Sequence, residues 1–174
     1  RDMALPGPFL AGQRLSAGQL NDATQKTIKT IEVGVGGIIV TTSGTTQSNI
    51  TQLQFGPIDL VAGALYEWKV NAVCQYNVAG GQEYQWAIRR NTALTGPIVT
   101  DWVIYNQVGT GGFRFVAWDQ FIATSNESGV MFYNSVVRVN GANTMNVYGQ
   151  LGTTNRTTMS LMRVGYSSEF QVVT

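Results

Sequence analysis

One stretch near the middle of the chain, Leu65–Tyr76, alternates between apolar and polar side chains over its whole length. It reads LYEWKVNAVCQY, and only Leu65 and Val73 break the alternation. Because successive side chains of a β-strand point to opposite faces, the pattern predicts a long strand with one apolar face and one wet face. The apolar face must be covered by a second layer, so this stretch favours a two-layer β-architecture. The apolar parity holds these residues: Tyr66, Trp68, Val70, Ala72, Cys74 and Tyr76.

Short β-type segments follow one another from residue 27 to the C-terminus, separated by turn residues roughly every 10 to 15 positions. No long helical pattern lies between them, so the prediction is an all-β protein, with a jelly-roll-like β-sandwich as the best single architecture. Pro57 is expected to mark a corner. The predicted strands are Thr27–Val33, Val35–Thr42, Asn49–Phe55, Ile58–Val61, Leu65–Tyr76, Glu83–Arg90, Ile98–Gln107, Phe113–Ala123, Val130–Val139, Met145–Leu151, Thr157–Val164 and Glu169–Thr174.

The first 26 residues differ from the rest of the chain. Met3–Leu15 contains two prolines, which argues for an extended arm. Ser16 and Gln19 have the spacing of a capping box, so a short helix is expected at about Ala17–Lys26. We therefore predict two units: an arm with a short helix at 1–26, serving as an anchor or oligomer contact, and a β-sandwich at 27–174. Within the first unit, Leu15 and Leu20 are candidate contact residues.

Composition excludes several classes of function. The chain has 174 residues, which fits one domain with a sizeable core. Charged residues make up 12% and the net charge is +1, so nothing electrostatic favours nucleic acid or an anionic membrane as partner. No apolar run is long enough to span a bilayer, and no signal peptide is visible, so we expect neither membrane insertion nor secretion through a signal peptide.

Catalytic and metal chemistry find few participants in this chain. It contains no histidine, which is the commonest acid–base group near neutral pH and the commonest zinc or copper ligand. Its single cysteine, Cys74, lies on the apolar parity and is predicted to be a small buried hydrophobe. The acids are scattered singly along the chain. Asp119 is the one whose position is least expected for an acid, because it shares parity with phenylalanines. We expect no catalytic residue, no cofactor and no metal site.

Some strands are apolar on both parities: Ile98–Tyr105, Phe113–Ile122 and Val130–Val139. One face of a sandwich should meet solvent, so an apolar outer face predicts a partner, most simply in a homotrimer packed sheet against sheet. Their aromatic residues are candidates for core or interface, and the sequence does not divide them between the two. They are Trp102, Tyr105, Phe113, Phe115, Trp118, Phe132 and Tyr133. Exposed aromatics on a jelly roll can instead stack on sugars, which makes Trp102, Tyr105, Trp118 and Tyr148 candidate glycan contacts.

Three stretches resemble virion proteins of tailed phages, especially those of actinobacterial hosts. Ala11–Asn21, AGQRLSAGQLN, is similar to their opening "GQ-x-L-T-A-x-x-L-N" pattern, with Ser16 where Thr is usual. Gly63–Val70, GALYEWKV, resembles the "x-Y-x-[FW]-x-[VL]" strand of C1q/TNF-like jelly rolls at phage tails. Met159–Val164 resembles their closing strand. The absence of a collagen-like Gly-X-Y run departs from C1q proteins proper.

The resemblance implies a trimeric jelly-roll head in the phage particle, attached to other virion proteins by its N-terminal arm. It implies a position at the tail tip, in a fibre or as a capsid decoration, and it carries no catalytic residues to transfer. Two alternatives stay open from the residues themselves. One is a carbohydrate-binding module that serves as a receptor-binding head and takes a host surface glycan. The other is an enzyme such as a depolymerase, which the missing histidine and sparse acids disfavour.

Overall fold

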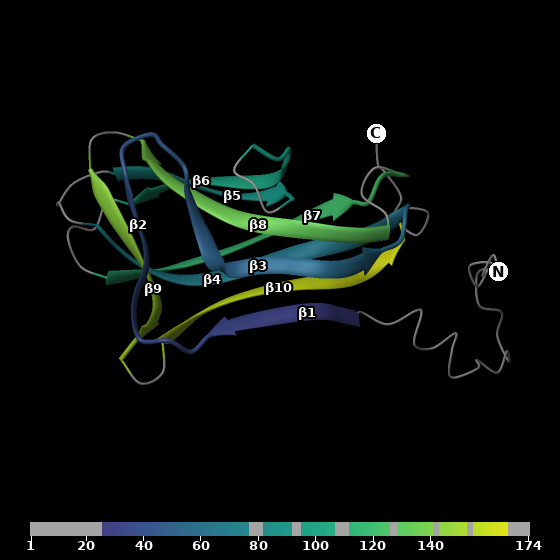
Figure 1. Ribbon diagram of the computed structural model, residues 1–174, viewed down its shortest axis with the longest axis horizontal. Helices are drawn as coiled ribbons and strands as arrows, with labels where there is room; N and C mark the ends of the chain where they lie inside the picture. Colours follow the sequence, from purple (N-terminus) through teal and green to yellow (C-terminus); the bar gives the residue numbers. More distant parts are fainter. Residues whose placement is uncertain are drawn as a thin grey trace, which may run out of the picture.

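The structure is a computed structural model, which describes residues 26–76, 82–91, 95–106, 112–125, 129–140, 143–152 and 155–166 (Figure 1). The described residues form ten β-strands. Their bounds are β1 (Lys26–Val33), β2 (Gly37–Ser43), β3 (Ser48–Leu60), β4 (Ala64–Tyr76), β5 (Gln82–Arg90), β6 (Ile98–Asn106), β7 (Gly112–Ile122), β8 (Gly129–Asn140), β9 (Thr144–Leu151) and β10 (Asn155–Tyr166).

The strands form two antiparallel sheets that pack face to face. The first sheet has the order β1-β10-β4-β9-β2, with β7 paired to β4, and the second has the order β3-β8-β5-β6. Figure 1 shows β5, β6 and β8 in one layer over β4, β10 and β1 in the other. The predicted all-β, jelly-roll-like sandwich is confirmed.

Two positions in the first sheet are each filled by two separate strands. For this reason it has six strands, against four in the second sheet. Along one side of β4, residues 64–71 pair with β10 and residues 73–76 pair with β9. The chain leaves the sheet between these segments as a hairpin, in which Leu151 faces Asn155. At the changeover, the Thr157 hydroxyl accepts a hydrogen bond from the Val73 N–H (3.1 Å) and donates one to the Tyr148 carbonyl (2.6 Å). On the far side of these two strands, β1 pairs with β10 and β2 pairs with β9, so β1 and β2 together also fill one position. The layer is therefore four strands wide, as in an eight-stranded jelly roll.

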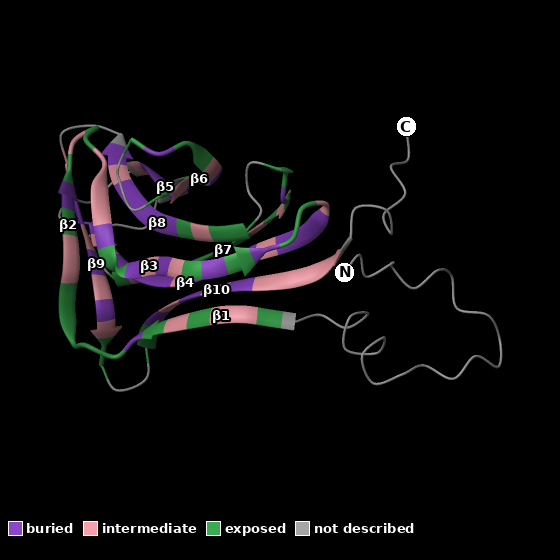
Figure 2. Ribbon diagram, turned by 45° about the vertical axis from the view of Figure 1, so that its right-hand side comes forward, coloured by how far each residue is buried: buried purple, intermediate pink, exposed green. Residues whose placement is uncertain are grey.

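The apolar parity of β4 supplies the middle of the core. Figure 2 shows the buried residues gathered on the strands where the two layers face each other. Trp68 is fully buried, and its ring centroid lies 5.3 Å from Phe55, 5.2 Å from Tyr133 and 6.2 Å from Phe121. Edge-on and stacked aromatic pairs of this kind add stability beyond the area that they bury. Cys74 is fully buried and unpaired, as predicted.

A second aromatic cluster surrounds Phe115 of β7. Its ring centroid lies 5.4 Å from Trp86, 5.8 Å from Tyr84 and 6.2 Å from Trp102. Trp86 and Tyr84 come from β5, and Trp102 comes from β6, so this cluster fastens β7 of the first sheet to the second. The two clusters together join both sheets along the length of the sandwich.

Some predicted boundaries were wrong. The expected corner at Pro57 does not divide two strands, because β3 runs through it with a shift of register between Phe55 and Ile58. Lys26, the last residue of the predicted helix, is the first residue of β1 and pairs with Arg163. The arm, residues 17–25 of the helix, the contact candidates Leu15 and Leu20, and the last predicted strand at 169–174 lie outside the described residues.

Candidate functional site

The structure divides the aromatic candidates between core and surface. Phe115 and Tyr133 are buried, and Phe113 and Trp102 are partly buried against the core. Of the two alternatives that the sequence left open, core or interface, Phe115 and Tyr133 belong to the core. Trp118 and Phe132 are exposed, at 64% and 43%. Tyr105 lies on β6, and its side chain is outside the described part of the structure.

The outer face of the first sheet carries an apolar row on β7, which we call the β7 row: Val116, Trp118 and Ile122. All are exposed, while their neighbours Phe115 and Ala117 point into the core. On the adjoining β4 they face Asn71, Lys69 and Leu65 in register. The predicted apolar outer parity of β7 is therefore confirmed, and within the described chain no layer covers it.

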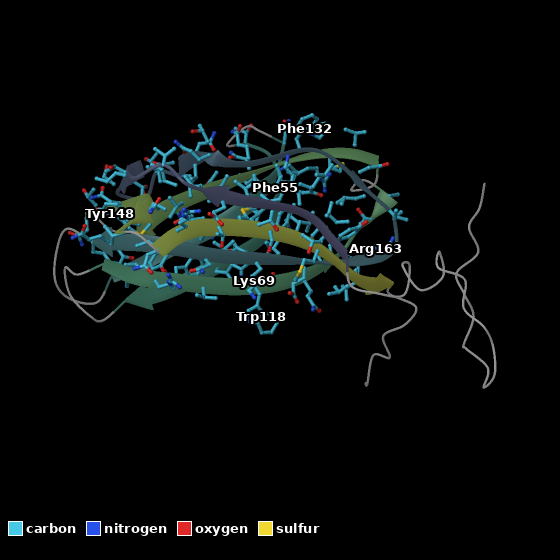
Figure 3. All side chains as sticks on the ribbon, turned by 90° about the horizontal axis from the view of Figure 1, so that it is seen from below. Phe55, Lys69, Trp118, Phe132, Tyr148 and Arg163 are labelled. Atoms are coloured by element: carbon cyan, nitrogen blue, oxygen red, sulfur yellow. The ribbon has the colours of Figure 1, made fainter. Side chains whose placement is uncertain are left out.

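Trp118 lines a shallow, open depression together with Glu67 and Lys69, which we call the Trp118 depression. Its volume of about 290 Å³ is at the small end of the range for ligand sites. In Figure 3 the Trp118 side chain projects away from the ribbon beside Lys69, whereas Phe132 lies on the opposite side of the molecule. The depression thus combines one flat apolar ring with one carboxylate and one ammonium group.

The pairing of β7 with β4 positions Trp118 and its neighbours. The Trp118 carbonyl accepts a hydrogen bond from the Trp102 indole N–H at 3.3 Å, so it points away from β4. Trp118 and Lys69 therefore form a non-hydrogen-bonded pair, the type in which opposite side chains lie closer together. Gln120 donates its side-chain N–H to the Glu67 carboxylate at 3.0 Å. These contacts hold the depression's walls on two paired strands and not on a loop.

The Asp119 carboxylate has hydrogen-bond partners in the fold. It is half-buried at the rim of the core, where its carboxylate accepts hydrogen bonds from the Thr100 hydroxyl and from the Gln120 backbone N–H (2.8 Å). Thr100 lies on β6, so the contact joins the two sheets at their β6–β7 side. Asp119, the acid least expected from its position in the sequence, thus has a structural role.

The outer face of the second sheet has its own apolar group, formed by Val130 and Phe132 of β8. Both are exposed, and Phe132 packs so closely on Gly56 of β3 that a Cβ there would overlap its ring. Toward the middle of this face, Ala87 and Val136 are fully buried. Polar side chains lie over this face: Arg89 donates to the Gln47 side chain (3.0 Å), and Gln85 donates to Asp101 (2.6 Å). Val103 of β6, which pairs with Gln85, is exposed as well, so this face carries apolar side chains on both β8 and β6.

Buried groups in the core offer no nucleophile at neutral pH. Burial raises the pKa of the Cys74 thiol, which keeps it protonated and unreactive. Burial also raises the pKa of Tyr76 and of Tyr84, with a smaller contribution from the nearby Cys74. Among the described residues, no group of three or more Cys, Asp or Glu side chains is placed to hold a metal ion.

Within the ranges that the structure describes, no helix is long and apolar enough to cross a membrane.

Sequence reasoning found Trp118 but missed Glu67 and Lys69 as its neighbours. Both were assigned only to the wet parity of the central strand. The pairing of β4 with β7 brings Lys69 opposite Trp118 and Glu67 opposite Gln120. The signal that would have found them is the register between two strands about 50 residues apart, which periodicity does not specify. Tyr148, another sugar candidate, donates its hydroxyl to the Gln75 side chain at 2.6 Å and is half-buried.

Comparison with known proteins finds likeness in fold only. No family model and no curated protein matches the chain. Among solved structures, Eiger TNF from S. frugiperda is similar over 86% of this chain and 98% of its own, with 8% identity and a TM-score of 0.47. The VP2 subviral particle of infectious bursal disease virus is similar over 82% of this chain and 38% of its own, with 11% identity and a TM-score of 0.40. A CBM22-1–GH10 fragment of Clostridium thermocellum xylanase 10B, in complex with xylohexaose, is similar over 87% and 30%, with 13% identity and a TM-score of 0.36.

Proposed function

We propose that this chain is a non-enzymatic structural and binding protein of a tailed-phage particle, displayed as a homotrimeric jelly-roll head. The observation that supports self-association is the set of apolar side chains on the outer faces of both sheets. Val116, Trp118 and Ile122 project from the first sheet, and Val130 and Phe132 from the second. Exposed apolar groups of this kind mark interaction surfaces more often than scattered single residues do. The phage assignment is supported by the three resembling stretches, at 11–21, 63–70 and 159–164.

The mass of the purified chain in solution tests the oligomer. The monomer is 18.9 kDa, and we expect light scattering to report three times that mass. A mass that stays at 18.9 kDa at every concentration would contradict the trimer. Double substitution of Val130 and Phe132 by Ser, compared with that of Val116 and Ile122 by Ser, would then tell which outer face makes the contact.

The N-terminal arm is proposed to anchor the β-sandwich to other virion proteins. Because β1 begins at Lys26 and pairs with β10, a deletion that tests the anchor should remove residues 1–25 and leave β1 complete. We expect the shortened chain to keep its strand signal in circular dichroism and its thermal transition, but to lose assembly onto particles. Retained assembly would contradict the anchor, and a chain that no longer folds would contradict the division into two units.

The tail tip, a fibre and a capsid decoration are the positions that fit this role. Immunogold labelling of intact particles with an antibody to the β-sandwich separates them, because tail and capsid lie far apart in the particle. The proposal expects label on the virion at one of these positions, and particles without label would contradict it.

An enzymatic role, such as a depolymerase, is the less favoured reading. Hydrolysis of a glycosidic bond needs two carboxyl groups facing each other across it. Among the described residues that line the Trp118 depression, Glu67 is the only carboxylate, and no second one stands opposite it. We expect no release of reducing sugar from host wall polymers, and measurable release would overturn this part of the proposal.

A glycan-binding role is the second candidate, favoured by one observation. The Trp118 depression places an exposed indole beside two groups that can bond to hydroxyls, Glu67 and Lys69. In this reading the jelly roll is itself the receptor-binding head, and its partner is a host surface glycan.

A further inference from the structure

We infer that the Trp118 depression is a binding site for one pyranose unit of a neutral glycan. This inference rests on the proposed binding role of the chain and deepens it by naming the ligand class and the residues. It commits Trp118 to a ligand, and leaves Val130 and Phe132 on the second sheet to self-association.

The indole supplies the apolar part of the site. Trp118 is 64% exposed, the largest exposed aromatic surface among the described residues. A pyranose ring has a flat face of C–H groups, which matches a flat indole in size and polarity. Burying that indole against a sugar removes apolar surface from water without needing a deep cavity. The openness of the depression suits a ligand that remains partly solvated.

The polar rim supplies the orientation. A pyranose carries a ring of hydroxyls around its apolar faces, and each hydroxyl both donates and accepts hydrogen bonds. The Glu67 carboxylate accepts from such hydroxyls, and the Lys69 ammonium group donates to them. Glu67 is held by the Gln120 amide at 3.0 Å, so its position is set before a ligand arrives. Binding sites of this kind join an apolar surface to a few placed polar groups.

The charges favour a neutral sugar over an acidic one. Glu67 and Lys69 carry opposite charges and both line the depression, so they give it no net charge. A sialic or uronic acid would bring its carboxylate beside Glu67 as well as beside Lys69. A neutral hexose meets no such repulsion, and its hydroxyls serve both groups.

The same charges argue against a second copy of the chain as the occupant. A packed protein interface would remove Glu67 and Lys69 from water, and charged residues are depleted at interface cores for that reason. The second sheet offers Val130 and Phe132 for self-association without that cost, since they are exposed away from Glu67 and Lys69. A sugar leaves both charged groups partly hydrated and bonded.

The experiment uses the full chain on a printed array of neutral hexose and N-acetylhexosamine oligosaccharides, with sialylated and sulfated glycans as the acidic set. One aromatic ring on an open surface supports only weak binding, with a Kd on the order of 1 mM. Each array signal is therefore confirmed by saturation-transfer NMR, which detects weak binding. We expect neutral glycans to bind and Trp118→Ala to weaken binding at least tenfold. Trp118→Phe should lose less, because it keeps a ring, and Glu67→Gln should lose affinity through its weaker acceptor. Phe132→Ala is the matched control, since it removes an exposed aromatic from the opposite sheet. Its affinity per site, measured by saturation-transfer NMR, should equal that of the wild type, whatever its oligomeric state does to the array signal.

Light scattering on the same variants separates this inference from the proposed trimer. Lost glycan binding in Trp118→Ala at an unchanged mass supports the site, whether the wild type is a trimer or a monomer. Unchanged binding in Trp118→Ala overturns the site, and so does the absence of any signal from neutral glycans. A lower mass of Trp118→Ala with no loss of glycan binding also overturns it, because Trp118 would then belong to the contact between copies.

Discussion

The two faces of β7 have similar side chains, but one face is buried and the other is exposed. Phe113, Phe115 and Phe121 alternate with Val116, Trp118 and Ile122, so both faces are apolar and both carry aromatic rings. The inner face packs against β5 and β6, where Phe115 meets Tyr84, Trp86 and Trp102. The outer face meets no second layer in the described chain. The difference teaches that hydrophobicity marks a face as able to be buried, whereas the position of the second sheet decides which face is buried.

The comparison also separates stability from binding. Phe115 is surrounded by aromatic rings at distances that favour edge-on and tilted packing. Trp118 is surrounded by a carboxylate, an ammonium group and water. We therefore assign Phe115 to the fold, whereas Trp118 is the residue on which the proposed binding site depends.

Truncation of the two side chains should give the largest contrast. Phe115→Ala removes a buried ring from the junction of the sheets and should lower the free energy of unfolding by about 3–5 kcal/mol. Trp118→Ala removes an exposed ring and should change it by no more than about 0.5 kcal/mol. Urea denaturation followed by circular dichroism measures both. Equal losses would contradict the assignment of the outer face to function.

Phe132 sharpens the comparison, because it is exposed and yet tightly seated on Gly56. A Cβ at Gly56 would overlap the Phe132 ring, and the φ of Gly56 is +145°. Gly56→Ala should therefore cost about 2–4 kcal/mol, from overpacking and from a backbone conformation that alanine rarely adopts. Gly63→Ala is the matched control, since Gly63 has φ +79° and nothing within 4 Å of its added Cβ.

The control should lose only the backbone term, about 1–2 kcal/mol. Urea unfolding of both variants measures the difference between them, which reports the overlap with Phe132. If Gly56→Ala cost no more than Gly63→Ala, Phe132 would be free to move aside, and it would resemble Trp118 instead of the core rings.

High pH tests the inner face through its buried titratable groups. Burial raises the pKa of Cys74, Tyr76 and Tyr84 above their ordinary values of 9.0, 10.0 and 10.0. Above about pH 9 the unfolded chain releases these protons while the folded chain keeps them. The stability that they contribute is thus complete below that pH and lost above it, with a slope of up to about 1.4 kcal/mol per pH unit for each group.

Urea midpoints at pH 7.5 and pH 10.5 measure this decline. Cys74→Ala removes the group that titrates first, so its stability should fall less between the two values. A wild-type midpoint that does not move would show that these side chains reach solvent in the folded chain.

An ion pair on the outer face of the first sheet should give the smallest effect. Arg156 of β10 pairs with Glu32 of β1, and both side chains are about half exposed, at 46% and 48%. Water and salt screen such pairs, so Glu32→Gln should cost no more than about 0.5 kcal/mol. Thermal unfolding in low and high salt checks this value. A loss above 1 kcal/mol would mean that this face is less solvated than its exposure indicates.

Much of the fold was predictable because strand periodicity is a local property. The inward residues of β4 were assigned correctly from alternation alone, and the two parities of β7 were told apart in the same way, although which of them faces the core was left open. The strand at Pro57 was not, because a proline that ends most strands here lies at a shift of register within a continuous edge strand. The partner of Asp119 was not predictable, because Thr100 lies on the other sheet. Both cases concern a contact between segments distant in the sequence.

The chain's own sequence determined the all-β class, the two parities of each strand and the burial of Cys74, because these follow from the alternation of side chains. Only the tertiary structure decided which aromatic rings are core and which are surface. It also decided that Glu67 and Lys69 stand beside Trp118, because that neighbourhood depends on the register between β4 and β7. Gln120 and Glu67 are 53 residues apart and bond only in the folded sheet. Register is set by the packing of the whole sandwich, and no local pattern encodes it.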